Sequence, residues 1–110
     1  MVRLASIIIP NWNGAAHLVD CLGSLERQTF ADFETVVVDN GSTDASLDLL
    51  AQDYPWVKVI PLTENLGFAG GCNTGIEQTS SEIVVILNND TEVEHEWLAE
   101  LLAAMEAYPE

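Results

Sequence analysis

Positive charge is what this sequence lacks most. Its 110 residues include three basic side chains, Arg3, Arg27 and Lys58, against 18 acidic ones, for a formal net charge of −15. So few cations cannot neutralise a row of phosphates, the interaction that supplies most non-specific affinity for DNA or RNA. Nucleic acid is therefore excluded as a partner. A phosphorylated small molecule would need a metal ion or backbone N–H groups to balance its charge.

Long apolar runs and cysteines are also scarce. No stretch approaches the ~20 apolar residues that a membrane-spanning helix requires, and the N-terminal run, stopped by Pro10, is too short for a signal-peptide core with its cleavage site. Cys21 and Cys72 lie far apart, without metal-ligand or disulfide spacing. We expect both to be buried thiols in a reducing compartment. The expected location is cytoplasmic, and peripheral to the membrane for a longer full-length protein.

The sequence does contain short apolar runs that alternate with helical patterns. Four β-branched, nearly continuous runs predict parallel strands covered on both faces, at residues 4–9, 35–38, 57–61 and 83–87. Three sets of apolar residues recur at i, i+3, i+4 and i+7 and predict helices: Leu18, Cys21, Leu22 and Leu25; Leu47, Leu50, Ala51 and Tyr54; Leu98, Leu101, Leu102 and Met105. Residues 68–78 are expected to be a glycine-rich loop that runs into a helix, with Phe68, Cys72 and Ile76 on its apolar face.

This alternation predicts one α/β domain over residues 1–110, a parallel βαβ sheet with right-handed crossovers. In such a sheet, ligands bind outside the carboxyl ends of the strands, where the strand order reverses. The segments that leave those ends are residues 10–14, 39–44, 62–73 and 88–92, and all are rich in small polar residues. These four segments are the expected ligand site.

Asp39 directly follows an apolar strand, which places a carboxylate at the strand's mouth. There it favours a hydrogen bond to a nucleobase or a ribose hydroxyl over a purely structural role. Ser42 or Thr43 is expected to cap the next helix, with Asp44 in its first turn. These last three positions therefore need no ligand to explain them.

Residues 88–92, with the sequence Asn-Asn-Asp-Thr-Glu, follow the last strand in the same manner. Oxygen-rich side chains suit Mg²⁺ or Mn²⁺, which takes one or two carboxylates and completes its shell with water and ligand phosphates. Asp90 is the expected ligand. The alternative is a polar turn before the last helix, capped by Thr91. A metal here would hold a diphosphate and stabilise it as a leaving group.

Aromatic and histidine side chains add less. Trp12 stands in the loop after the first strand, where its face could pack on a base or cover the edge of the core. Trp56 and Trp97 are expected to be packing residues. His17 and His95 have no partner by spacing and are expected to be ordinary helix residues, so no Ser-His-Asp or Cys-His nucleophile is predicted.

Taken together, these segments resemble the inverting glycosyltransferases of family 2 with the GT-A fold, especially the rhamnosyltransferase-like members. The matching stretches are residues 6–13, 28–30, 34–44, 65–75 and 87–93. Several motifs in the right order and spacing are more specific than any one of them. The resemblance implies a Rossmann-like domain that binds a UDP- or dTDP-linked sugar with Mg²⁺ or Mn²⁺.

The resemblance also implies site residues, carried over by position. The implied donor-binding residues are Pro10, Asn11, Trp12, Asn13, Asp39, Asn40, Asn73, Asn88 and Asn89, and the implied metal ligand is Asp90. Asn40 and Asn88 each replace an acid that is common in the family. Cys72 stands where many members have an arginine, which removes one phosphate contact, so the metal should matter more here.

Family members continue past the metal motif, through strands that bind the acceptor and a second acidic motif that supplies the general base. No carboxylate of this chain is assigned to that base, which is expected beyond Glu110. The expected enzyme transfers a sugar with inversion to a hydroxyl of a glycan or lipid-linked acceptor, and these residues alone bind only the donor. The alternative is a non-catalytic nucleotide-sugar-binding module. A truncated domain is also expected to leave apolar surface that drives homo-oligomer formation.

A dinucleotide-binding oxidoreductase is excluded, because such an enzyme carries G-x-G-x-x-G after its first strand. This chain has residues 10–14, Pro-Asn-Trp-Asn-Gly, in that place.

Overall fold

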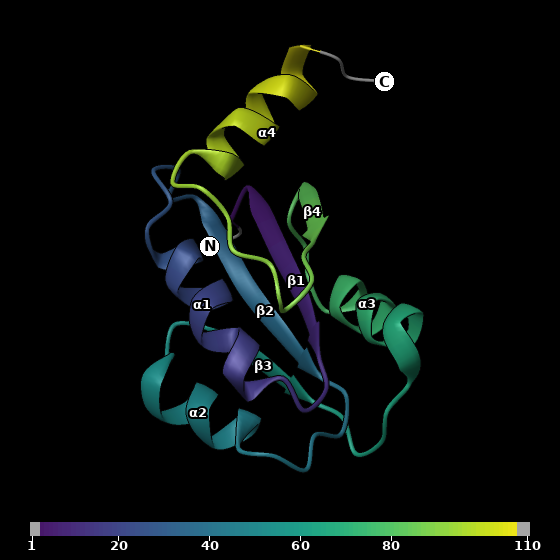
Figure 1. Ribbon diagram of the computed structural model, residues 1–110. Helices are drawn as coiled ribbons and strands as arrows, with labels where there is room; N and C mark the ends of the chain where they lie inside the picture. The colour runs from purple at the N-terminus through teal and green to yellow at the C-terminus, as the bar shows by residue number, and fades with distance from the viewer. Residues whose placement is uncertain (1–2, 108–110) are drawn as a thin grey trace.

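Four parallel strands form one sheet, and helices cover both of its faces (Figure 1). The computed structural model describes residues 3–107. The strands are β1 (Ala5–Asn11), β2 (Phe33–Asp39), β3 (Lys58–Pro61) and β4 (Ile83–Ile86), in the order β3-β2-β1-β4. The helices are α1 (Ala15–Glu26), α2 (Ser46–Asp53), α3 (Gly67–Glu77) and α4 (Trp97–Ala107). The predicted α/β class and parallel sheet are confirmed.

The two central strands run further than their apolar segments. Ile7, Ile8 and Ile9 of β1 are fully buried, as expected for a strand covered on both faces. The parallel pairing of β1 with β2 continues to Asn11, which lies opposite Asp39. The polar ends of both strands are therefore part of the sheet, and not loop residues as the apolar pattern predicted.

One face of the sheet packs against α1 and α2. The predicted buried face of α1 is confirmed, since Leu18, Cys21, Leu22 and Leu25 are all buried. On the shorter α2, Leu50 is buried and Tyr54 closes the helix end against the core, whereas Leu47 and Ala51 are exposed. Only half of the predicted apolar face of α2 is therefore buried.

The expected caps are wrong. The second helix begins at Ser46, so Ser42 and Thr43 lie in the turn before it. Ser42 Oγ donates to Asp39 Oδ1, and the Thr43 N–H donates to Asn13 Oδ1. Asp44 also precedes the helix, where its Oδ1 accepts from the Ser46 N–H at 2.9 Å. Thr91 does not cap α4 either, because that helix begins six residues later, at Trp97.

The opposite face of the sheet is covered by α3. The prediction for residues 68–78 is right about the helix and about Cys72, and wrong about the loop before it and about Phe68 and Ile76, which are exposed. The glycines are helical from Gly67 onward, and Phe68 is 59% exposed. The face turned to the sheet carries Gly71, Cys72 and Gly75 instead. A Cβ added at Gly75 would lie 2.5 Å from Ile8 Cγ2 and 3.0 Å from a methyl of Val38. The absence of a side chain there lets the helix approach the strands closely.

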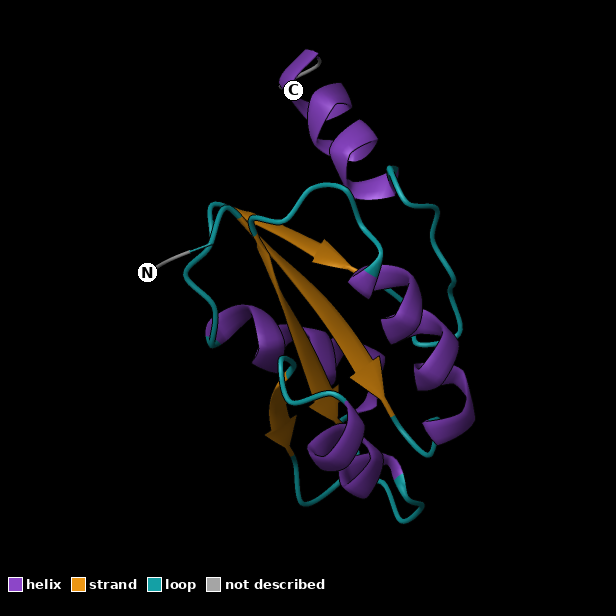
Figure 2. Ribbon diagram, turned by 90° about the vertical axis from the view of Figure 1, so that its left-hand side faces the viewer, coloured by secondary structure: helices purple, strands orange, loops and turns teal. Residues whose placement is uncertain are grey.

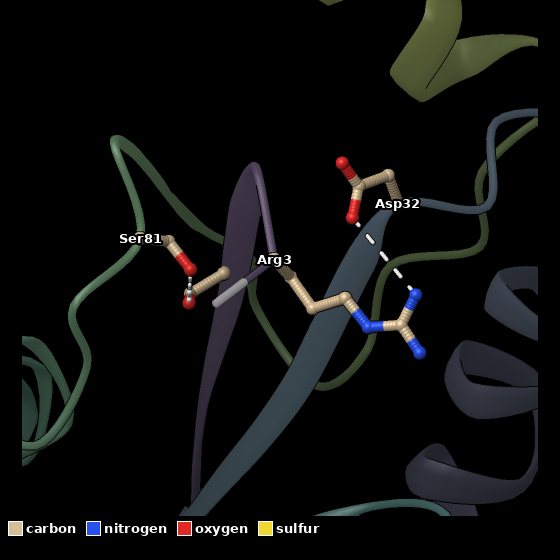
Figure 3. Close-up of polar contacts among 4 residues, drawn as sticks. Arg3, Asp32 and Ser81 are labelled. Atoms are coloured by element: carbon tan, nitrogen blue, oxygen red, sulfur yellow. Dashed lines mark hydrogen bonds and ion pairs between the residues drawn. The ribbon is translucent and has the colours of Figure 1, made fainter. Parts of the chain in front are cut away.

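The amino ends of the strands hold α4 and an exposed ion pair. Figure 1 shows α4 projecting from this end, anchored by the fully buried Leu98. Arg3 and Asp32 face one another nearby at 3.9 Å (Figure 3), an exposed pair of the kind that stabilises little. His95 lies in the turn before α4, so only His17 is the helix residue that was expected. No helix within residues 3–107 is long and apolar enough to cross a membrane.

Two tryptophans pack as expected. Trp97 is partly buried against the core cluster of the α1 face. Trp56 stacks edge-on against Tyr54, with ring centroids 6.2 Å apart. Both cysteines are buried free thiols, which confirms the predicted burial.

The close approach of α3 predicts the effect of a single methyl group. We expect Gly75→Ala to lower the free energy of unfolding by about 1–3 kcal/mol, because the Ile8 and Val38 side chains would have to move. The control is Gly23→Ala on α1, where the added Cβ meets only the flexible end of Arg27 at 3.5 Å. That variant should gain about 0.5–1 kcal/mol from helix propensity. Urea denaturation measures both, and equal stability of the two variants would contradict the close packing.

Candidate functional site

The strand order identifies one end of the sheet as the place to look for a ligand. Strands β2 and β4 flank β1 on opposite sides, so the order reverses between β1 and β4. The arrows of β1 and β2 point away from α4 (Figures 1 and 2). The carboxyl ends, with the loops that leave them, therefore lie at the end opposite α4. Open α/β sheets bind ligands at this position.

A buried chain of hydrogen bonds joins three of these loops. Asp39 Oδ1 accepts from Asn11 Nδ2 at 3.1 Å and from Ser42 Oγ at 2.7 Å, and its Oδ2 accepts from the Ser42 N–H at 3.0 Å. Asn89 Nδ2 donates in turn to Asn11 Oδ1 at 2.8 Å. The ends of β1 and β2 and the turn after β4 are thus fixed relative to one another.

Asp39 is fully buried. Its carboxylate is balanced by three donors of the protein, as a buried charge without a cation requires. In this conformation the carboxylate orders the loops around it, and its contact with a base or ribose stays a prediction. An aspartate followed three residues later by serine is a frequent turn motif, which could have indicated the Ser42 bond from the sequence.

Hydrogen bonds also join the loops after β1 and β2 at the surface. Asn13 has a left-handed backbone (φ 49°), and its Oδ1 accepts from the N–H groups of Thr43 at 2.7 Å and Asp44 at 3.2 Å. Asp44 Oδ2 accepts in return from the Ala15 N–H at 3.2 Å. This carboxylate serves the first turn of α1, which has no side-chain cap of its own. Partial burial opposes the charge, but hydrogen bonds from Ser46 and Ala15 outweigh it and lower the pKa of Asp44.

Asn40 binds the loop that follows β3. It is only 4% exposed, its Nδ2 donates to the Gly67 carbonyl at 3.2 Å, and its Oδ1 accepts from the Leu66 N–H at 3.2 Å. An aspartate could accept from Leu66 but would face the Gly67 carbonyl without a proton to donate. The amide at this position, where the resembling family commonly has an acid, therefore has a structural use.

Asp90 differs from Asp39 in its exposure. It lies in the turn after β4, exposed to solvent with Asn88, while Asn89 is held by Asn11. The carboxylate lies near Cys21, whose pKa is raised to about 11 by burial first and by the charge of Asp90 second. Within residues 3–107 there is no group of three or more His, Cys, Asp or Glu residues arranged to hold a metal. One carboxylate beside amide oxygens fits a hard cation that keeps water and phosphate ligands.

No basic side chain reaches this end of the sheet. The chain's three basic residues are Arg3, which precedes β1, Arg27, which follows α1, and Lys58, which opens β3. These positions all belong to the amino ends of the strands. Lys58 is used there as a donor to the Gln78 carbonyl at 3.0 Å. A diphosphate at the carboxyl ends would find no cationic side chain among residues 3–107.

The remaining predicted residues lie around the network without joining it. Trp12 is 55% exposed, so it covers little of the core and leaves an aromatic face open to solvent. Pro10 is half-buried within β1, and Asn73 is exposed on α3. A hollow of about 920 Å³ begins beside the Asp90 turn, at Thr91 and Glu92, and extends to Arg27 and Thr29 at the amino ends of the strands. Its lining includes four glutamates, so it does not suit a diphosphate.

The two amide bonds of Asn40 predict a difference between two asparagines of the same region. We expect Asn40→Asp to lower the free energy of unfolding by about 1–3 kcal/mol, because the side chain at this buried position would become charged and could no longer donate to the Gly67 carbonyl. The matched control is Asn65→Asp, which adds the same charge but keeps its bond, since Asn65 uses only its oxygen, accepting from the Gly67 N–H at 2.7 Å. Its effect should stay within about 0.5 kcal/mol. Urea denaturation measures the stability of both variants. Equal losses of stability would contradict the structural role of the two Asn40 hydrogen bonds.

Known proteins resemble this chain in sequence and in fold. Residues 6–110 match the family described as glycosyl transferase family 2. Glycosyltransferase AglE of Haloferax volcanii is 35% identical over 98 positions, covering 84% of this chain and 32% of that protein.

Two solved structures extend the likeness. S. aureus TarS in complex with UDP-GlcNAc superposes with a TM-score of 0.86 at 29% identity, over 98% of this chain and 32% of that one. Mannosyltransferase PcManGT from Pyrobaculum calidifontis, in complex with GDP-Man and Mn²⁺, has a TM-score of 0.72 at 28% identity, over 84% of this chain and 29% of that one. The chain thus spans about a third of the length of these relatives. With the parallel sheet and the polar loops at its carboxyl ends, the match over nearly all its residues shows that the chain belongs to glycosyl transferase family 2.

Proposed function

We propose that this chain is the donor-binding half of a glycosyltransferase. Its strand-end loops bind a nucleoside-diphosphate sugar, linked to UDP or dTDP, together with Mg²⁺ or Mn²⁺. The observation that carries the proposal is the exposed carboxylate of Asp90 at an end of the sheet that has no basic side chain. The same proposal places the protein in the cytoplasm or at its membrane surface, where the free thiols of Cys21 and Cys72 stay reduced.

The charge of the donor is the reason for the cation. A diphosphate would meet a chain with a net charge of −15 whose three basic residues lie at the other end of the sheet. The opposing charge must then come from a bound cation and from N–H groups at helix N-termini. The donors named for two solved neighbours, UDP-GlcNAc and GDP-Man, carry such a diphosphate, and Mn²⁺ accompanies the second.

Different residues of the chain would bind the cation and the base of the donor. Asp90 would hold the cation, with oxygens of Asn88 and Asn89 beside it. When bound, the cation supplies charge stabilisation for the departing diphosphate. Trp12 offers an open aromatic face beside the same loops for the base. The buried network beneath keeps these side chains in a fixed arrangement, which lowers the entropy lost on binding.

The transfer itself needs more than these residues. With inversion, the hydroxyl of a glycan or lipid-linked acceptor attacks opposite the departing nucleotide, and a general base removes its proton. None of the carboxylates described above is assigned to that step. The relatives are about three times as long as this chain, and we propose that the acceptor site and the base belong to the remaining part of the full-length protein.

A non-catalytic module that only binds the nucleotide sugar is the alternative. It would share the donor site, so donor binding alone does not separate the two functions. Sugar transfer by the full-length protein from a labelled donor does, because a module would bind the donor and form no glycosidic product.

Removal of the Asp90 carboxylate tests the donor site. We expect the wild-type chain to bind UDP in the presence of Mn²⁺, and Asp90→Ala to weaken that binding by at least about tenfold, since it removes the charged ligand of the cation. Isothermal titration calorimetry with and without Mn²⁺ measures this. Asp53→Asn, at the exposed end of α2, is the control for the loss of one negative charge and should bind as the wild type does. A folded wild-type chain that binds neither UDP nor dTDP would refute the proposal.

A further inference from the structure

Asp90 lies in a segment that has no regular structure of its own. Between the end of β4 at Ile86 and the start of α4 at Trp97, the chain forms neither helix nor strand. A hydrogen bond from the Thr91 N–H to the Asn88 carbonyl, at 3.1 Å, closes the turn that carries Asp90. This bond is local, and the bond from Asn89 Nδ2 to Asn11 Oδ1, at 2.8 Å, ties only the part of the turn before Asp90 to β1. Further contacts hold the residues that follow Asp90.

Those contacts come from one side of α1. Ser24 is almost fully buried, and its hydroxyl accepts from the Val93 N–H at 3.1 Å while donating to the Cys21 carbonyl at 2.7 Å. The Cys21 thiol in turn lies 3.9 Å from the Asn88 carbonyl. These positions are three residues apart and therefore face the same way on the helix. They hold the segment on both sides of Asp90.

Gln28, just after α1, holds the far end of the same segment. Its Nε2 donates to the Glu94 carbonyl at 2.6 Å, and its Oε1 accepts from the Leu98 N–H at 3.0 Å. The same Nε2 also reaches the Ser24 carbonyl at 3.1 Å, which fixes the side chain against the helix. The Thr29 N–H adds a bond to the His95 carbonyl at 2.9 Å. The segment is thus bound to α1 along most of its length.

We propose that Ser24 and Gln28 are positioning residues, which hold the turn carrying Asp90 where a cation can bridge it to the donor diphosphate. This inference rests on the proposed function, because it takes Asp90 as the cation ligand. The bond to Leu98 also serves as a helix cap, which by itself is an ordinary structural role. The bonds to Val93 and Glu94 are different, since they tie to α1 a stretch three and four residues beyond Asp90 that lies outside any helix or strand.

The test removes each side-chain bond and measures cation binding directly. Gln28→Met keeps the length of the side chain and Ser24→Ala removes one oxygen. We expect each variant to bind Mn²⁺ about five- to tenfold more weakly in the presence of UDP. The readout is the Mn²⁺-induced broadening of backbone amide NMR signals at residues 88–92. Amide hydrogen exchange at Val93 and Leu98 should rise in the same variants.

Two controls separate positioning from stability. Gln52→Met, on the exposed side of α2, makes the same replacement away from the segment and should change nothing. Gly75→Ala disturbs packing on the opposite face of the sheet. If Ser24 and Gln28 acted only through stability, the folded variants would bind Mn²⁺ as Gly75→Ala does. The proposal expects weaker binding by the folded Ser24 and Gln28 variants alone.

The possible results are distinct. A folded wild-type chain without Mn²⁺-dependent broadening overturns the proposed function, and the positioning role with it. Binding that Asp90→Ala abolishes but that Gln28→Met and Ser24→Ala leave at the wild-type level overturns the positioning role alone. If Gln28→Met fails to fold, Ser24→Ala decides by itself, because it removes a single oxygen from an otherwise unchanged helix.

Discussion

A carboxylate that is buried without a cation needs a donor for each of its oxygens, and the loops of this protein are arranged around that need at Asp39. Asn11 and Ser42 supply the donors, and Asn89 extends the chain of bonds across the point where the strand order reverses. Breaking one member would leave a buried charge or amide unpaired, which is far more unfavourable than losing an exposed bond. Loops from three strands therefore behave as one rigid unit, although they are distant in sequence.

The placement of charge follows the same division between the two ends of the sheet. The basic side chains and the exposed ion pair lie at the amino ends, while the carboxyl ends carry acids and amides. Amides at Asn11, Asn40 and Asn89 can each donate and accept at once, which lets them join loops without adding to the negative charge around Asp39. Asp90 and the aromatic face of Trp12 remain exposed at this end, together with Asp44, Glu64 and Phe68. This separation of buried structural groups from exposed ones is what a ligand site requires.

Much of this fold could be predicted from the sequence, because a strand buried on both faces has to be apolar throughout, as residues 36–38 are. The amphipathic pattern of α1 was sufficient for the same reason. The pattern failed in part at α3, where it marked Phe68 although the face that carries Gly71, Cys72 and Gly75 packs on the sheet. It also failed for Ser42 and Thr43, since capping competes with Asp39, three residues before Ser42, and with Asn13, which only the folded chain brings near Thr43. The oxygen-rich turn at Asp90 could be predicted from the sequence. The role of Gln28 could not, because it depends on contacts with residues some 70 positions away.

The two hydrogen bonds of the Asn40 amide also affect its chemical stability. Asparagine before glycine is the pair in which the next backbone nitrogen most readily attacks the side-chain amide, and the resulting succinimide opens to aspartate or isoaspartate. Asn40 precedes Gly41, yet its amide is pinned at both atoms by Leu66 and Gly67. The attack requires the amide carbon to turn toward the Gly41 nitrogen. Succinimide formation therefore requires the loop to open first. The two hydrogen bonds of the Asn40 amide therefore oppose this reaction for as long as the loop stays closed.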